Sequence, residues 1–207
     1  MKINQLVDRS YLINLDARVD RLECSSKQLE ENGISFQRFP AVNGFDIENN
    51  TTMTDGQYGN YISHLRVLEE CVKDDIGTVA IFEDDVEFCD GFEDKFSELY
   101  YQVPSDWDMI YLGHNRPAST NVPTESPNVL KIFGAFAIHA FILNRRAIEM
   151  ACNDLSNTTQ QADVYYANAQ STLNTYGFAN QLCSQAPGWS DIEQGDRNYR
   201  WIFGWEG

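Results

Sequence analysis

The amino-acid sequence predicts an α/β fold in which a mostly parallel central sheet is flanked by helices. In the first half of the 207-residue chain, short apolar stretches typical of buried strands alternate with longer segments of helical spacing. Strands joined through a helix usually lie parallel in one sheet. The chain contains neither the GxGxxG pattern of dinucleotide-binding loops nor the GxxxxGK[ST] pattern of P-loops. We expect residues 1–207 to form one such domain, because this length suits a single core.

The first strand and helix are predicted near the N-terminus. Tyr11–Leu15 is apolar and forms the strand, and the following segment from about Arg18 to Asn32 has helical spacing. Asp16 is suited to cap the start of this helix. Gly33 can adopt the left-handed backbone conformation that often ends a helix.

The middle of the chain continues the alternation. Ile34–Val42 contains a proline and predicts a second strand at a sheet edge, and Thr54–Val72 has the spacing of an amphipathic helix. Thr78–Phe88 then begins with the apolar run VAIF, which predicts a buried strand.

The second half is predicted to contain the following elements in order: a helix at Phe92–Tyr101, a strand at Met109–Leu112, a mobile loop at His114–Pro127, strands at Val129–Phe133 and Ala135–Leu143, a helix beginning at Asn144 or Arg145, a helix after Gln161-Ala162, and a strand-containing segment at Tyr176–Gly195. Residues 196–207 form an aromatic C-terminal tail.

Composition limits the classes of ligand. The net charge of −16 argues against a nucleic-acid binder, because such proteins neutralise phosphates with Lys and Arg. An anionic ligand would also be repelled unless a metal or a local basic cluster offset the acidic field.

The sequence predicts a cytoplasmic protein without a transmembrane segment. Its five cysteines are scattered and odd in number, which favours a reducing compartment over a disulfide framework. The N-terminal residues lack the apolar core of a signal peptide, and no run approaches the roughly 18 apolar residues of a membrane span.

Three consecutive carboxylates, Glu83, Asp84 and Asp85, follow the predicted buried strand. Because like charges repel at this spacing, a compensating group is expected, and carboxylates at a strand end suit Mn²⁺ or Mg²⁺. Ligands of α/β proteins usually bind in the crevice at the carboxyl ends of strands. The alternative is a solvated acidic turn.

Two arginines follow closely after the end of the first predicted strand, Tyr11–Leu15. Arg18 and Arg21 fall in the first turn of a helix, where the dipole favours acids, so an anion at the strand end would explain them. The alternative is two solvated arginines. His64, near the start of the Thr54–Val72 helix, is either a site residue or a hydrogen-bonded packing residue.

Four segments in this order resemble glycosyltransferase family 25, which includes bacterial lipooligosaccharide galactosyltransferases and procollagen galactosyltransferases. They are YLINLDARVDR, FQRFPAVNG, GNYISHLRVLEE and VAIFEDDVEF. The segments SDWDMIYLG and YGFANQLCSQAPGWSDIEQG extend the resemblance to residues 10–195. This chain has Asn60 where the family often has Cys, and Gln161 where the family has a proline.

The resemblance implies a GT-A-type nucleotide-sugar domain that moves a hexose to a hydroxyl of a glycan or glycoconjugate. It implies galactose from UDP-galactose, inversion at the reacting carbon, and lipopolysaccharide biosynthesis as the setting. By motif position it implies Mn²⁺ or Mg²⁺ at Asp85 and Glu83. Donor-binding residues would be Asn14, Leu15, Arg18, Arg21, His64, Glu83 and Asp84. His139, Gln185 and Ser190 would contact the acceptor or line the site.

Two points stay open from the sequence. Asp191 and Asp163 are rival general bases for the acceptor hydroxyl, and Asp163 also suits the start of a helix without any chemistry; His139 equally suits a strand core. The competing functions are a non-catalytic carbohydrate- or nucleotide-binding relative and a metal-dependent phosphohydrolase.

Overall fold

A computed structural model describes residues 1–115 and 122–199 of the protein. Its helices are α1 (Ile3–Leu6), α2 (Val19–Glu31), the short 3₁₀ turn η1 (Gly44–Asp46), α3 (Asp55–Lys73), α4 (Phe92–Tyr100), α5 (Arg145–Asn157) and α6 (Ala162–Ala169). Its strands are β1 (Arg9–Asn14), β2 (Gln37–Pro40), β3 (Thr78–Glu83), β4 (Val86–Phe88), β5 (Met109–Tyr111), β6 (Val122–Pro123), β7 (Val129–Lys131), β8 (Ala140–Asn144), β9 (Thr175–Phe178), β10 (Cys183–Gln185), β11 (Gly188–Ser190) and β12 (Gly195–Arg197).

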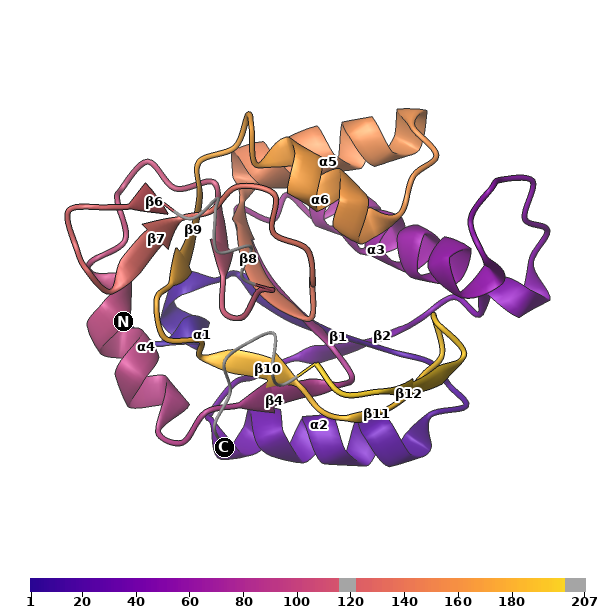
Figure 1. Ribbon diagram of the computed structural model, residues 1–207, viewed down its shortest axis with the longest axis horizontal. Coiled ribbons are helices and arrows are strands. Elements are labelled where there is room, and N and C mark those ends of the chain that lie inside the picture. The colour runs from indigo at the N-terminus through magenta and orange to yellow at the C-terminus, as the bar shows by residue number, and fades with distance from the viewer. Residues whose placement is uncertain (116–121, 200–207) are drawn as a thin grey trace.

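Eight of the described strands form one large sheet in the order β2-β1-β3-β8-β5-β9-β7-β6 (Figure 1). β2, β1 and β3 run parallel, as do β5 and β9, whereas β8 and β7 run against the remaining strands of the sheet. Two small antiparallel ladders, β4 with β10 and β11 with β12, complete the described structure. The predicted α/β class, with a mostly parallel central sheet flanked by helices, is confirmed.

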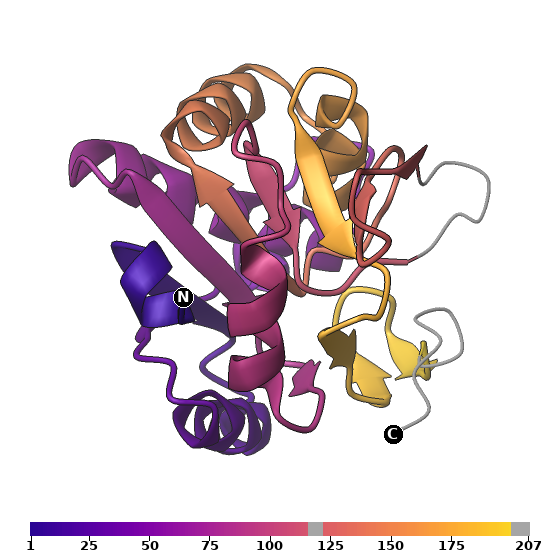
Figure 2. The same ribbon diagram turned by 90° about the vertical axis from the view of Figure 1, so that its left-hand side faces the viewer.

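Helices cover both faces of the sheet (Figures 1 and 2). The alternation of side chains along the strands produces two apolar cores. Tyr11 and Ile13 of β1 pack with residues of α3, α5 and α6, whereas Leu12 between them packs with residues of α1, α2 and α4. β1 and β3 are therefore buried on both faces, which explains the consecutive apolar residues at their centres, YLI in β1 and VAIF in β3.

Most of the predicted elements are found within a few residues of their expected bounds. Gly33 has a left-handed backbone (φ +65°) just after α2, as a helix-ending glycine requires. Thr54 caps α3 through a capping box with Gln57. The predicted cap of α2 was wrong: Arg18 is the N-cap residue, and Asp16 instead accepts a hydrogen bond from Arg38 on the neighbouring strand β2.

The predicted strand from Ala135 to Leu143 was also wrong in its first half. Only the part from Ala140 onward is a strand, β8. Gly134 and Ala137 both have left-handed backbones, with φ of +64° and +70°. An extended ladder cannot continue through such residues, and alanine adopts this conformation at a cost of about 1–2 kcal/mol. The segment before β8 is therefore an irregular turn held in an uncommon conformation.

Two predicted segments lie partly outside the described residues. The predicted loop from His114 to Pro127 includes residues 116–121, and the C-terminal tail includes residues 200–207. Within the described remainder, β6 pairs with β7 and β12 pairs with β11. No helix in ranges 1–115 and 122–199 is both long and apolar enough to cross a membrane.

Close backbone packing joins α3 to the loop before it. A Cβ atom on Gly59 would lie 2.5 Å from the carbonyl oxygen of Val42 and 2.6 Å from the amide nitrogen of Gly44. Both neighbours are backbone, so Gly59→Ala is expected to lower the free energy of unfolding by about 2 kcal/mol, although alanine favours an isolated helix by about 1 kcal/mol. Urea unfolding measures the change.

The control is Arg66→Ala, an exposed position on the same helix, which should change the stability by less than about 0.5 kcal/mol. Equal or greater stability of Gly59→Ala would contradict the close approach.

Candidate functional site

The site lies at the carboxyl ends of β1 and β3, which are neighbouring parallel strands. Ile13 of β1 pairs with Glu83 of β3, so Asn14 and the acidic triplet emerge at the same edge of the sheet. A cavity of about 560 Å³ opens there. Its lining includes the predicted residues Asn14, Leu15, Arg18, Arg21, Glu83, Asp84, Asp85, Gln185, Ser190 and Asp191.

Asp84 is fully engaged by its neighbours. One carboxylate oxygen accepts a hydrogen bond of 2.7 Å from the Asn14 amide, and the other accepts one of 2.8 Å from the Arg21 guanidinium. Burial raises the pKa of Asp84 above its ordinary value, against the opposing effect of Arg21. Asp84 therefore joins the end of β1 to α2 and places Arg21 over the cavity.

Asp85 has a different environment. Its Oδ2 accepts a hydrogen bond of 3.2 Å from Gln185 and lies 4.0 Å from Arg21, whereas its Oδ1 is buried and has no hydrogen-bond partner among the described residues. Burial, together with the charges of Glu83 and Asp84, raises the pKa of Asp85 to about 7. A buried carboxylate oxygen without a partner is costly, so the site is suited to a further positive group.

Glu83 is held from the side of α3. Its Oε1 accepts a hydrogen bond of 2.8 Å from Asn60 and lies 3.2 Å from Nε2 of the buried His64. Burial would raise the pKa of Glu83, but the contacts with His64 and Asn60 outweigh it, and the pKa is lowered. His64 and Asn60 are four residues apart, so both face the same carboxylate from one side of the helix.

Arg18 and Arg21 both reach into the larger cavity. The Arg18 guanidinium contacts Asp191 at 2.5 Å and holds Asp20 through two hydrogen bonds of 3.0 and 2.8 Å. Arg21 also donates to the backbone carbonyl of Trp189. The two arginines thus attach the β11 segment and the loop after it to the start of α2.

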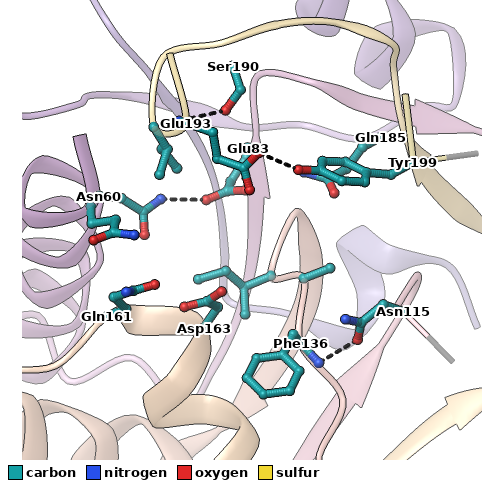
Figure 3. A pocket seen from close by; sticks show the side chains of 14 residues that line it. Asn60, Glu83, Asn115, Phe136, Gln161, Asp163, Gln185, Ser190, Glu193 and Tyr199 are labelled. Carbon is teal, nitrogen blue, oxygen red and sulfur yellow. Dashed lines mark hydrogen bonds between the residues drawn. The ribbon is translucent and has the colours of Figure 1, made fainter. Parts of the chain in front are cut away.

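A smaller cavity of about 260 Å³, whose lining side chains are drawn in Figure 3, shares part of its lining with the larger one. Both cavities are lined by Asn60, Glu83, Gln185 and Ser190, so these residues mark where the two meet. Asp163, in the first turn of α6, lines only the smaller cavity. Burial raises the pKa of Asp163. The two rival bases from the sequence therefore lie in different cavities, because Asp191 lines only the larger one.

Two of the predicted histidines lie behind the cavities. His139 is fully buried and lines neither of the two, which agrees with the core position that the sequence left open for it. Burial lowers its pKa to about 4. His64 likewise lines neither cavity and stacks on Phe141, with ring centroids 6.0 Å apart. Its contact with Glu83 makes it a positioning residue.

The structure adds lining residues that the sequence did not single out. In the smaller cavity these include Gln57, Asn115, Phe136 and Tyr199, and Asn60 emerges as a hydrogen-bond donor to Glu83. The spacing of Asn60 to His64 could have indicated a shared helix face. Nothing in the sequence could have indicated Phe136, because the turn that presents it was expected to be a strand.

Comparison with known proteins supports the resemblance. The model of the family described as glycosyltransferase family 25 (LPS biosynthesis protein) matches residues 7–182. The chain is 27% identical over 161 residues to a Bos taurus protein named "Probable inactive glycosyltransferase 25 family member 3", covering 66% of this chain and 27% of the relative. It is also 27% identical over 150 residues to mouse procollagen galactosyltransferase 2, covering 62% of this chain and 24% of that protein.

Among solved structures, a glycosyltransferase involved in the glycosylation of the major capsid of PBCV-1 aligns at 10% identity with a TM-score of 0.45, covering 72% of this chain and 64% of that chain. The chain spans about a quarter of the length of the curated relatives named above. The family model, however, matches residues 7–182, most of the chain, and this range includes Asn14, the acidic triplet from Glu83 to Asp85, and Asp163. The chain therefore belongs to glycosyltransferase family 25.

Proposed function

We propose that the protein transfers a hexose, galactose from UDP-galactose, to a hydroxyl of a glycan or glycoconjugate, with inversion and with a divalent metal. The observation that carries the proposal is the Asp85 carboxylate, whose buried Oδ1 has no partner and which lies 4.0 Å from Arg21 at the larger cavity. Such an arrangement suits a divalent cation next to a diphosphate.

The larger cavity suits the donor. Its volume of about 560 Å³ is within the usual range for small-molecule sites, roughly 300–1,000 Å³. Arg18 and Arg21 supply positive charge among the carboxylates of this cavity, so they can pair with part of a diphosphate, and a divalent metal would offset the rest of its charge. Asn14 and Leu15 at the end of β1 would lie against the nucleoside.

The residues present fit Mn²⁺ or Mg²⁺ only if the donor supplies ligands as well. Among the described residues, no group of three or more His, Cys, Asp or Glu side chains could hold a metal ion alone. Mg²⁺ is commonly bound through one or two carboxylates together with substrate phosphates, which fits Asp85 with Glu83 as second carboxylate. When bound, the metal would stabilise the negative charge that develops on the departing diphosphate.

Asp163 fits the general base better than Asp191. The carboxylate of Asp191 is paired with Arg18 at 2.5 Å on the donor side. Asp163 lines the adjoining cavity, where an acceptor would approach the reacting carbon from the side opposite the diphosphate. One base on that side would take the hydroxyl proton in a single displacement, which produces inversion.

A non-catalytic nucleotide-sugar-binding protein is the second candidate, because relatives from Bos taurus and Homo sapiens are named as inactive. This function would retain the donor cavity and lack transfer. If the protein consumes the nucleotide sugar only when a sugar acceptor is added, it is a transferase and not a non-catalytic binding protein. Consumption of the nucleotide sugar with water alone would indicate a phosphohydrolase.

Calorimetry with UDP-galactose and UDP-glucose, each with Mn²⁺ or with chelator, tests the donor site. We expect binding to be at least about tenfold tighter with Mn²⁺ than with chelator, because the acidic cavity repels an uncompensated diphosphate. Arg66→Ala, which changes an exposed charge of α3 outside both cavities, is the control and should bind like wild type. If the folded protein binds no nucleotide sugar under any condition, the proposed function is wrong.

A further inference from the structure

The positive charges of the site are all on one side of the junction between the cavities. The larger cavity is lined by Arg18, Arg21 and Arg197. The smaller cavity has no Lys, Arg or His among its described lining residues, and it contains the carboxylates Glu83, Asp163 and Glu193. The larger cavity is also lined by carboxylates, but its arginines offer a negatively charged group a partner, whereas the described lining of the smaller cavity offers it none.

The acidic character of the smaller cavity is not fully compensated. Glu193 is paired with Arg197 and accepts a hydrogen bond of 2.7 Å from Tyr199. Glu83 is held by Asn60 and His64, and Asp163 accepts a hydrogen bond of 2.7 Å from the neighbouring backbone amide of Val164. Among the described lining residues of this cavity, an acceptor with a carboxylate or phosphate would meet no arginine with which to pair.

The remaining polar groups of the smaller cavity are suited to hydroxyl groups. Five side-chain amides line it: Gln57, Asn60, Asn115, Gln161 and Gln185. Each amide has both a donor and an acceptor end, and a sugar hydroxyl also donates and accepts. A cavity rich in amides can therefore satisfy several hydroxyls without a net charge on the ligand.

Phe136 adds an apolar surface to this cavity (Figure 3). Its side chain is 40% exposed, although large apolar side chains are usually covered. Its amide donates a hydrogen bond of 2.5 Å to the Asn115 side chain, and the next residue, Ala137, has the uncommon φ of +70°. A backbone strained in this way persists where the surrounding structure enforces it, often at ligand sites.

We infer that the smaller cavity is the acceptor subsite, that it takes an uncharged sugar ring stacked on Phe136, and that it rejects anionic sugars. The inference rests on the proposed function and adds the chemical class of its acceptor. The C–H face of a pyranose would cover the exposed ring of Phe136, and its hydroxyls would meet the amides. Asp163 then lies beside the ring, where one hydroxyl can lose its proton.

The test uses matched acceptors that differ by one carboxylate: 4-nitrophenyl β-glucoside against the β-glucuronide, and the galactoside against the galacturonide. Release of UDP from UDP-galactose with Mn²⁺ is measured for each. We expect kcat/KM for the neutral member of a pair to exceed that of the acid by at least about tenfold. Equal or faster use of the acids would overturn the inference.

Donor binding, measured in parallel by calorimetry, separates this inference from the proposed function. If UDP-galactose binds but no sugar accelerates UDP release above the rate in water, the acceptor inference is wrong and the donor site stands. If UDP-galactose does not bind, both are wrong.

Variants of Phe136 test the stacking surface. Phe136→Leu is expected to raise the acceptor KM about tenfold with an unchanged donor Kd, since the ring contact with the sugar is lost. Phe136→Tyr keeps an aromatic ring at this position, so its acceptor KM should equal that of the wild type. Tyr101→Leu is the control, because Tyr101 is 72% exposed and lines neither cavity. An unchanged KM in the folded Phe136→Leu protein would contradict the stacking.

A gain-of-charge variant tests the electrostatic part. Gln161→Lys places a cation in the smaller cavity and is expected to raise kcat/KM for the glucuronide about tenfold relative to the glucoside. Gln160→Lys makes the same change one residue earlier, outside the lining of both cavities, and should leave the ratio unchanged. A ratio that moves equally in both variants, or in neither, would overturn the electrostatic selection.

Discussion

Asp85→Asn is expected to lower the rate of hexose transfer about a thousandfold or more and to abolish the effect of Mn²⁺ on donor binding. Asparagine keeps the shape of the side chain but removes the charge that would hold a divalent cation beside the diphosphate. Removing one fixed group that stabilises developing charge commonly costs about 10²–10³ in kcat, and here the metal is lost with it.

The fold is expected to tolerate this change. The Asp85 carboxylate is buried beside Glu83 and Asp84 with Oδ1 unpartnered, so its charge does not stabilise the folded chain. The melting temperature of Asp85→Asn should equal or exceed that of wild type, and calorimetry of UDP-galactose with Mn²⁺ measures the lost metal effect. Metal-dependent binding of wild-type strength in the variant would show that Asp85 does not hold the metal.

Asp163→Asn is expected to lower kcat about 10²–10⁴-fold while leaving the donor Kd unchanged, because a general base acts on the acceptor hydroxyl and does not contact the donor. A base must be ionised to act, so activity rises with pH through its pKa. Burial raises the pKa of Asp163, so the acidic limb of the kcat profile should lie above the ordinary range for an aspartate. This limb should disappear in the variant.

Asp191→Asn is the matched comparison. Asp191 is paired with Arg18 on the donor side, so its loss is expected to change the donor Kd and to lower kcat less than tenfold. Steady-state kinetics over a pH series with both variants distinguishes the two acids. A larger loss of kcat in Asp191→Asn, with the acidic limb retained in Asp163→Asn, would reverse the assignment.

The acidic site was predictable in outline because it follows directly from strand order. Asn14 and Glu83 each end an apolar strand, and parallel neighbouring strands bring their carboxyl ends to one edge of a sheet. The sequence did not assign different roles to the three acids, because all three follow the same predicted strand and differ little in chemistry. Only the packing around each carboxylate showed that Asp84 is paired, that Glu83 is held by α3, and that one oxygen of Asp85 has no partner.

The smaller cavity was not predictable in the same way. Asp163 of α6 and Phe136 of the turn before β8 are separated by 27 positions along the chain, and they line one cavity with Glu83 of β3. The turn that carries Phe136 depends on left-handed backbones at Gly134 and Ala137, whereas the local apolar pattern favoured an extended strand. Tertiary contacts outweighed that preference, which is worth only about 1 kcal/mol per residue.

The sequence by itself determined the α/β class, the family, and the strand end at which the charged groups gather, because apolar periodicity and motif order are local properties of the chain. Tertiary structure alone decided which residues line which cavity. The arginines line the larger cavity, Asp163 and most of the amides line the smaller one, and His139 lies in the core. These outcomes depend on which distant segments meet, and the direction of a side chain at such a meeting is set by packing, not by its neighbours in sequence.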